Sequence, residues 1–262
     1  MPQLGAMTSA IDTPLPKRAQ RHRDNGRKSG PGLFFNIVGI IGEILITISL
    51  VLGLYVFWQL YWSSWKAEDI RDTAVVAFHN QLSDEKTTVG EERYDAPPEF
   101  TPVGHGETMG ILHVPKWAMQ IPVVEGTDQY LLDQAMAGHY SETQLPGEVG
   151  NFVMAGHRRT YGNNFRRIDI MKPGDRMVME TKNAWLVYEV TSHEIVYPDQ
   201  WQVTLPVPNQ MDAQPVERLM TLTTCHPEFG NSQRYILYLR LHHWVARDTG
   251  IPAELTYEID GK

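Results

Sequence analysis

The stretch ERLMTLTTCHPEFGNSQRYILYLRL, residues 217–241, consists of two apolar, strand-like runs joined by a polar loop. The first run, ERLMTLTTC, ends at Cys225, and the second, RYILYLRL, begins at Arg234. If the two runs pair as an antiparallel hairpin, the end of the first lies beside the start of the second. The sequence therefore predicts that Cys225 and Arg234 are neighbours across the mouth of the loop.

Further short runs of the same kind precede this stretch. They occupy residues 109–114, 119–124, 151–157, 175–180 and 184–196, and turn signals separate them. Two stretches, DQYLLDQA and NNFRRIDI, are short enough to be single helical turns in the connections. Many short strands with few helices are typical of a closed or sandwiched antiparallel sheet. We therefore expect an all-β domain.

The chain contains a single cysteine, Cys225. A lone cysteine is either a small buried hydrophobic residue or a free thiol kept for chemistry, and its place at a strand end favours the thiol. A free thiol has a pKa of about 8.5 and needs a basic neighbour to become a nucleophile. His157, at the end of the run NFVMAGH, is the favoured neighbour. His139 is the second candidate, and its alternative role is that of a hydrogen-bonded structural histidine. The alternative role of Arg234 is a surface salt bridge.

No spacing typical of a metal site is present. The sequence has neither a CxxC nor an HExxH motif, and it has no glycine-rich phosphate loop after a strand. We therefore expect no metal and no cofactor.

Residues 33–62 form an apolar run with one formal charge, Glu43. Residues 44–62 alone would span about 28 Å as a helix, which matches the hydrocarbon thickness of a bilayer. Aromatic residues gather at the end of the run, as in an interfacial belt: Trp58, Tyr61, Trp62 and Trp65. A cleaved signal peptide is the main alternative, but its apolar segment would be shorter and would end at small residues. A buried core helix is a third reading.

Charge is distributed unevenly along the chain. The total formal charge is -8, yet residues 1–32 carry about +4 and the part after the apolar run about -11. Basic residues before a membrane span favour a cytoplasmic N-terminus, so the domain after the span is expected outside the cell. An acidic domain is also a poor partner for nucleic acid. Residues 64–82 have helical spacing, and the proline-containing residues 83–106 predict a solvated spacer.

The motif TLTTC (221–225), with Arg234 nine positions on and NFVMAGHR (151–158) upstream, resembles the signature of the sortase family. The resemblance spans residues 109–241. The details TLTTCHP and AGHRRTYG, together with the N-terminal apolar run, are most similar to the class E housekeeping sortases of high-GC Gram-positive bacteria.

This resemblance implies an eight-stranded closed β-barrel with short helices, preceded by one transmembrane helix. It implies a membrane-anchored cysteine transpeptidase in which Cys225 is the nucleophile, His157 the general acid/base and Arg234 the electrostatic stabiliser. The implied reaction cleaves the Thr-Gly bond of an LAXTG or LPXTG sorting signal and joins the new carboxyl group, through a thioacyl enzyme, to an amine of a peptidoglycan precursor. Thr224 and His139 are candidates for lining the substrate groove.

The composition of the chain and the resemblance together divide it into four parts. Residues 1–32 are expected to be a basic cytoplasmic tail, 33–62 a transmembrane signal anchor, 63–106 an extracytoplasmic helix and stalk, and 107–262 the catalytic domain. The implied partners are secreted proteins with a C-terminal sorting signal, the precursor amine and the lipid bilayer, with no nucleic acid.

Two other classes compete with this interpretation. A cell-wall cysteine peptidase or an L,D-transpeptidase would also place Cys and His outside the membrane, although the Ser-His-Gly-Cys motif of the latter is absent. A non-catalytic, membrane-anchored binding module would tolerate the substitution Cys225→Ala.

Overall fold

The computed structural model describes residues 32–58, 63–82 and 88–256. The chain forms two compact units, residues 1–50 and 51–262, and each is described by itself. The basic tail and the aromatic residues at 59–62 lie outside the described residues.

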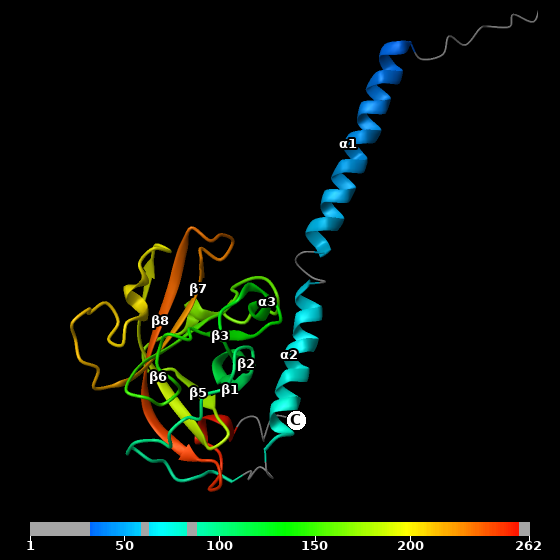
Figure 1. Cartoon of the computed structure of the whole chain (residues 1–262). Helices are drawn as coiled ribbons and strands as arrows, with labels where there is room; N and C mark the ends of the chain where they lie inside the picture. The colour runs from blue at the N-terminus through cyan, green and yellow to red at the C-terminus, as the bar shows by residue number, and fades with distance from the viewer. Residues whose placement is uncertain (1–31, 59–62, 83–87, 257–262) are drawn as a thin grey trace, which may run out of the picture. The chain divides into compact units, whose positions relative to one another are not determined.

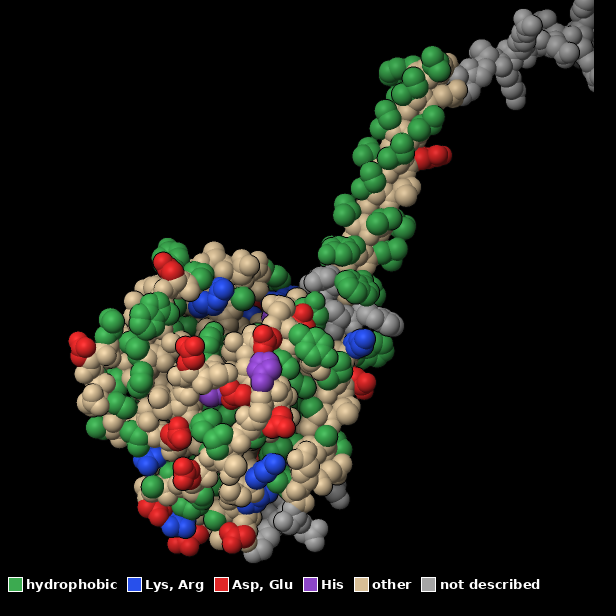
Figure 2. All heavy atoms as spheres, viewed as in Figure 1, with side chains coloured by type: hydrophobic (Ala, Val, Ile, Leu, Met, Phe, Trp, Pro, Cys, Tyr) green, Lys and Arg blue, Asp and Glu red, His purple; other side chains and the backbone are tan. Residues whose placement is uncertain are grey.

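Helix α1 (Leu33–Phe57) is 25 residues long and has no buried residue. Its mean hydropathy over 18 residues is 2.5, so it is long and apolar enough to cross a membrane. Figure 2 shows hydrophobic side chains along the visible length of this helix. The predicted apolar span is therefore a helix, as expected, over the part that the structure describes.

Eight strands close into a barrel in the order β1-β2-β3-β4-β7-β8-β6-β5 (Figure 1). The strands are β1 (Thr108–Val114), β2 (Met119–Glu125), β3 (Ala137–His139), β4 (Gly150–Ala155), β5 (Arg176–Glu180), β6 (Ala184–Val196), β7 (Arg218–His226) and β8 (Gln233–Ala246). Two neighbouring pairs, β2 with β3 and β4 with β7, are parallel, and the other six are antiparallel. The eight-stranded barrel confirms the expected fold.

Short helices fill the connections. They are α3 (Gln129–Leu132) and the 3-10 turns η2 (Pro115–Trp117), η3 (Ile168–Ile170), η4 (Trp201–Thr204) and η5 (Ala253–Leu255). α3 and η3 lie in the two stretches predicted as single helical turns. Strand β3 is the one that the sequence analysis did not single out, because three residues are too few to show a period of two.

Strand β7 shows how the alternating pattern builds the core. Met220 and Leu222 are fully buried members of the main hydrophobic cluster inside the barrel, since successive side chains of a strand point to opposite faces. Burial of each such side chain contributes about 1.5–3 kcal/mol. Thr221, on the other face, donates a hydrogen bond of 2.8 Å from its hydroxyl to Asn151 Oδ1 of β4. The same strand therefore packs the core and binds its neighbour.

Helix α2 (Ser63–His79) packs on the barrel beside β1 and β2 (Figure 1). Val75 and Phe78 are buried against Ile111 of β1, which confirms the predicted helix and gives its apolar positions a partner. His79 Nε2, at the helix end, lies 3.1 Å from Glu180 Oε2. The helix is thus joined to the barrel by apolar packing and by one buried carboxylate.

The sequence predicts a solvated spacer for residues 83–106. Residues 88–106 are mostly exposed, and parts of the segment also contact the barrel. Arg93 pairs by its backbone with Trp244, and its guanidinium lies 4.3 Å from the centre of the Trp244 ring. Phe100 and Val103 pack on the main core cluster. The apolar side chains between the prolines pack against the barrel, and these contacts hold the segment along its surface. The predicted domain boundaries stay predictions, although α2 and this segment share a compact unit with the barrel.

The side chain of Glu180 is completely buried, and its carboxylate accepts hydrogen bonds from three side chains. His113 Nε2 lies 2.7 Å from Oε2, His79 contacts the same oxygen, and Arg247 Nη1 donates to Oε1 at 2.7 Å. Burial acts to raise the pKa of Glu180, but the hydrogen bonds from His113 and His79 outweigh it and lower the pKa from 4.5 to about 2. The ionised carboxylate therefore stabilises the fold above pH 4.5, and this stabilisation is lost as the pH falls from 4.5 towards 2.

We predict that Glu180→Gln lowers the free energy of unfolding at pH 7 by about 3 kcal/mol, because it leaves the three donors without their anion. The deficit relative to wild type should shrink by about 2 kcal/mol between pH 7 and pH 3, since wild type loses the same stabilisation on protonation. Circular dichroism of the full chain in detergent during urea unfolding measures both values. The control is Glu217→Gln, which removes an exposed 3.2 Å pair with Arg240 and should change stability by less than about 0.5 kcal/mol. A Glu180→Gln deficit that is absent at pH 7, or undiminished at pH 3, would contradict this assignment.

Candidate active site

Cys225 is half-buried near the end of β7. Its backbone partner in the antiparallel β7–β8 pair is Arg234. The hairpin predicted from the sequence is therefore confirmed, and it places the thiol and the guanidinium on adjacent strands at the mouth of the loop.

His157 reaches the same place from the other side of β7. Strand β4 runs parallel to β7, and the last pair of this ladder joins Ala155 to Thr223. Gly156 continues the contact, because its N–H donates to the Thr223 carbonyl at 3.2 Å. A Cβ on Gly156 would lie only 2.8 Å from the ring of Phe165, so this close approach requires glycine. Parallel strands have their carboxyl ends at the same edge, and His157 therefore leaves β4 beside Cys225.

The ring of His157 is oriented by helix α3. Its Nε2 lies 2.7 Å from Asp133 Oδ1, and a carboxylate can only accept, so this nitrogen carries the proton. The side-chain amide of Gln129 lies 3.5 Å from the same nitrogen, and the Tyr161 ring lies 5.2 Å from the imidazole ring. Within the described residues, Nδ1 has no hydrogen-bond partner, and His157 and Cys225 do not hydrogen-bond to each other. Nδ1 is therefore the nitrogen available to exchange a proton.

Arg234 donates hydrogen bonds to carbonyls of its own loop through only one of its three nitrogens. Its Nη1 donates to the carbonyls of Asn231 and Gln233, both at 2.9 Å. Nε and Nη2 have no hydrogen-bond partner among the residues that the structure describes. Burial raises the pKa of Tyr140, and the charge of Arg234 acts in the opposite direction. The phenol of Tyr140 is thus within the electrostatic reach of Arg234.

A hollow of about 500 Å³ is lined in part by Tyr140. Three loops line it: the one before α3, the β3–β4 loop and the connection that contains η4. Trp201 of η4 is 55% exposed and gives the hollow an apolar wall. A concave, mixed surface of this size can hold a few residues of an extended peptide.

Thr224 and His139 lie close to the site but are bonded within the protein. The Thr224 hydroxyl donates to the Gly156 carbonyl at 2.7 Å, and the side chain is buried. His139 is also buried, with Nδ1 2.7 Å from Glu125 Oε2 and Nε2 3.1 Å from the Gln144 carbonyl. Both side chains hold backbone segments in place, and their role in binding substrate stays a prediction.

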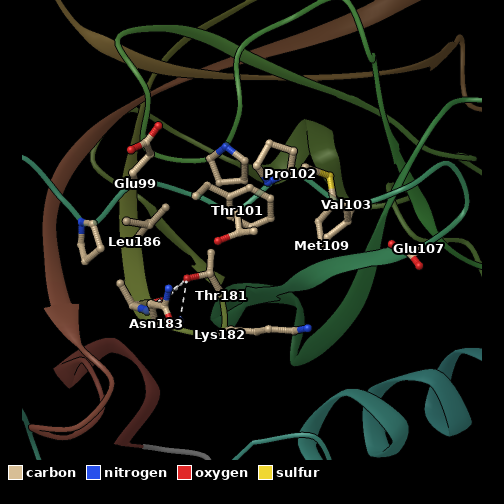
Figure 3. Close-up of a pocket in the computed structure, with 14 residues that line it drawn as sticks. Glu99, Thr101, Pro102, Val103, Glu107, Met109, Thr181, Lys182, Asn183 and Leu186 are labelled. Carbon is tan, nitrogen blue, oxygen red and sulfur yellow. Dashed lines mark hydrogen bonds between the residues drawn. The ribbon is translucent and has the colours of Figure 1, made fainter.

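A second cavity, of about 370 Å³, lies at the other end of the barrel. Figure 3 shows Thr101, Pro102 and Val103 on one side of it and Thr181, Lys182 and Asn183 on the other. The neighbouring residue Ala184 pairs with Ala246, whereas Cys225 pairs with Arg234, twelve residues earlier in β8. The cavity is therefore separated from Cys225 by the length of the barrel.

One group among the described residues could hold a metal ion: His79, His113 and Glu180 have ligand atoms within 4.8 Å of one another. Both oxygens of Glu180 already accept hydrogen bonds from the two imidazoles and from Arg247. Glu180 pairs with Trp185 at the far end of the barrel, so this group is separate from Cys225.

Sequence reasoning missed three residues around the thiol: Asp133, Tyr140 and Arg158. Asp133 stood in a predicted helical turn, but nothing marks its carboxylate among the 31 acidic residues. Tyr140 follows His139 in AGHY, and Arg158 follows His157 in AGHR. Their adjacency to the two candidate histidines was the only available signal.

Comparisons with known proteins agree with this architecture. A family profile described as a sortase domain matches residues 112–242. The chain is 33% identical to Sortase SrtE1 of Streptomyces coelicolor over 253 residues, which cover 94% of this chain and 68% of that protein. The solved SrtA sortase from Actinomyces oris is 52% identical with a TM-score of 0.61 and covers 63% of this chain and 96% of its own. Sortase E1 from Streptomyces coelicolor, solved with a tripeptide in the active site, is 38% identical with a TM-score of 0.55 and covers 57% of this chain and 97% of its own.

Proposed function

The chain belongs to the sortase family, and we propose that it is a membrane-anchored cysteine transpeptidase whose reaction is carried by Cys225, His157 and Arg234. The observation that carries the proposal is the register of three adjacent strands: β4 and β7 end together, and β8 begins beside that end. A thiol, an imidazole and a guanidinium thereby gather at one edge of the barrel. The proposed substrates are secreted proteins with an LAXTG or LPXTG sorting signal, and the proposed acceptor is an amine of a peptidoglycan precursor.

In the first half of the reaction, the Cys225 thiolate attacks the carbonyl carbon of the threonine. A C–S bond forms, the C–N bond to glycine breaks, and His157 gives a proton to the departing amine. In the second half, the acceptor amine attacks the thioester, gives a proton to His157 and releases the thiolate. The thioester conserves the energy of the cleaved peptide bond, so no external energy source is required.

Arg234 suits the role of electrostatic stabiliser in both halves. Its guanidinium stays charged at every relevant pH, and its two unused nitrogens can donate to the oxyanion or to the substrate backbone. The carbonyls of Asn231 and Gln233 hold Nη1, so the group is partly fixed before substrate binds. Preorganised donors of this kind stabilise developing charge without reorganisation during the reaction.

The hollow beside Tyr140 is the proposed site for the sorting signal. It is lined by Tyr140, whose phenol lies within the electrostatic reach of Arg234, and it has the exposed Trp201 as an apolar wall. A peptide seated there would place its scissile bond towards the ends of β4 and β7. Thr224 and His139 contribute to this site by fixing the backbone around it.

Helix α1 is the proposed membrane anchor. The basic residues before it, about +4 in net charge over residues 1–32, favour a cytoplasmic N-terminus. The barrel then lies outside the cell membrane, where secreted proteins and cell-wall precursors meet.

The central test follows transfer of a peptide containing LAXTG or LPXTG to an amine acceptor by mass spectrometry, with the full chain in detergent. We expect cleavage between Thr and Gly with transfer to the amine. Cys225→Ala should abolish transfer, and His157→Ala and Arg234→Ala should each lower kcat by about 100-fold or more. The control Arg240→Ala removes an exposed arginine of the same strand and should keep activity within about twofold. Absence of any transfer with both peptides by a folded wild-type chain would refute the proposal, and hydrolysis alone would reassign the chain to the cysteine peptidases.

A second prediction concerns Asp133. Because its carboxylate holds the His157 Nε2–H at 2.7 Å, Asp133→Ala removes the acceptor and should misorient the imidazole, which lowers kcat by about 10- to 100-fold with little change in KM. Asp128→Ala is the matched control, since Asp128 pairs with His105 at the surface of the same loop. Steady-state kinetics of both variants measure the effect. Equal kcat for Asp133→Ala and wild type would show that the contact does not orient His157.

The orientation can be read from the single cysteine. In intact cells, a small membrane-impermeant methanethiosulfonate reagent should modify Cys225, because the thiol is half-buried and lies in the proposed outer domain. In a Cys225→Ala background, Ser29→Cys should react only after the cells are permeabilised. The reverse pattern would contradict a cytoplasmic N-terminus.

A further inference from the structure

We propose that Arg158 is a positioning residue for Cys225, because its guanidinium fastens the end of β7 to the loop that carries His157. The inference rests on the proposed function, in which Cys225 and His157 must meet at reacting distance. It concerns a residue outside the proposed trio of Cys225, His157 and Arg234.

The ladder between β4 and β7 stops just short of the thiol. Its last pair is Ala155 with Thr223, and the remaining contacts between the strands are those of Gly156 with Thr223 and Thr224. On the other side, β8 continues to pair with β7 past Cys225. The thiol is therefore held by a backbone ladder on its β8 side and lacks one on its His157 side.

Arg158 fills this gap with its side chain. Its Nη1 lies 3.0 Å from His226 Nδ1 and 3.5 Å from the Cys225 carbonyl oxygen, so the main bond is to His226 and the carbonyl is at the limit of hydrogen bonding. Its Nη2 donates to Asp169 Oδ2 at 3.0 Å. The guanidinium also lies 5.7 Å from the centre of the Tyr235 ring in β8. One side chain thus joins the loop after β4, the end of β7, and η3.

The burial of Arg158 separates it from an ordinary surface ion pair. Its side chain is only 3% exposed, whereas Asp169 is 49% exposed. An exposed ion pair contributes little to stability, but burying a guanidinium costs free energy that its hydrogen bonds must offset, so the groups that accept those bonds are held in place. Nη1 and Nη2 of Arg158 have such partners, whereas Nε is buried without one among the described residues. Because a guanidinium only donates, His226 Nδ1 is the acceptor in this contact.

The planar fork explains why arginine is required here. Two nitrogens of a single rigid group reach His226 and Asp169 in different directions, which the single ammonium of lysine cannot reproduce. Lysine would retain the charge and lose the bridge. The pair Arg158→Gln and Arg158→Lys therefore separates a bridging role from a charge effect.

The first measurement is hydrogen–deuterium exchange of the full chain in detergent, which requires no substrate. In Arg158→Gln and Arg158→Lys, the amides of residues 224–233 should exchange about tenfold faster or more, because the bond between the β7 end and the His157 loop is lost. Arg240→Gln, a matched substitution of an exposed arginine in β8, should leave these amides unchanged. If the amides of residues 224–233 exchange at the wild-type rate in Arg158→Gln, the proposal is wrong. This outcome does not depend on which reaction the chain catalyses.

The second measurement is transpeptidation per folded molecule, at a temperature well below the unfolding midpoint of each variant. Both Arg158 variants should lower kcat by about tenfold or more while KM stays within about twofold, since the sorting-signal site is intact. His226→Asn should keep kcat within about threefold of wild type, because its amide oxygen can accept from Arg158 in place of Nδ1. His226→Leu should behave like Arg158→Gln.

The outcomes are distinguishable from failure of the proposed function. If wild type transfers no peptide, the proposed function fails, and the exchange data alone decide whether Arg158 immobilises Cys225. If wild type is active and Arg158→Lys has wild-type kcat and exchange, the bridge is unnecessary and the proposal is wrong. Equal activity of His226→Leu and His226→Asn would also overturn it.

Discussion

Strand β7 has a parallel neighbour on one side and an antiparallel neighbour on the other, and this pairing determines which side chains meet at the end of the strand. A parallel partner ends at the same edge as β7, and an antiparallel partner begins there. His157, Cys225 and Arg234 are therefore brought together by register, although 68 residues separate the first from the second. Gly156 and the Thr224 hydroxyl then bring the strand ends into close contact.

Contacts beyond the barrel ladder refine this arrangement. Asp133 of the α3 connection orients His157, and Arg158 bridges the gap where the β4 ladder stops. At the opposite end, Glu180 joins α2 to the barrel through His79 and His113. The proposed catalytic residues thus depend on strand register for their approach and on side-chain hydrogen bonds for their orientation.

The sequence predicts the strands and the Cys225–Arg234 pair because a hairpin is local and its alternating pattern is visible. It does not predict β3, which is too short to show a period. It does not predict the contacts of residues 88–106 with the barrel, because prolines indicate an extended chain but not the surface on which that chain lies. Asp133 and Arg158 escape prediction for a related reason: their function depends on distant partners, and ordinary acidic and basic residues carry no spacing signal.

The most direct test of the account is to trap the covalent intermediate. The full chain is incubated with an LAXTG peptide in the absence of an amine acceptor, quenched in acid, digested and mapped by tandem mass spectrometry. The account predicts an acyl group ending in threonine on Cys225 that hydroxylamine removes, as expected of a thioester. Consumption of the peptide with an unmodified Cys225, or an acyl group on any other residue, would contradict the central claim that the end of β7 carries the nucleophile.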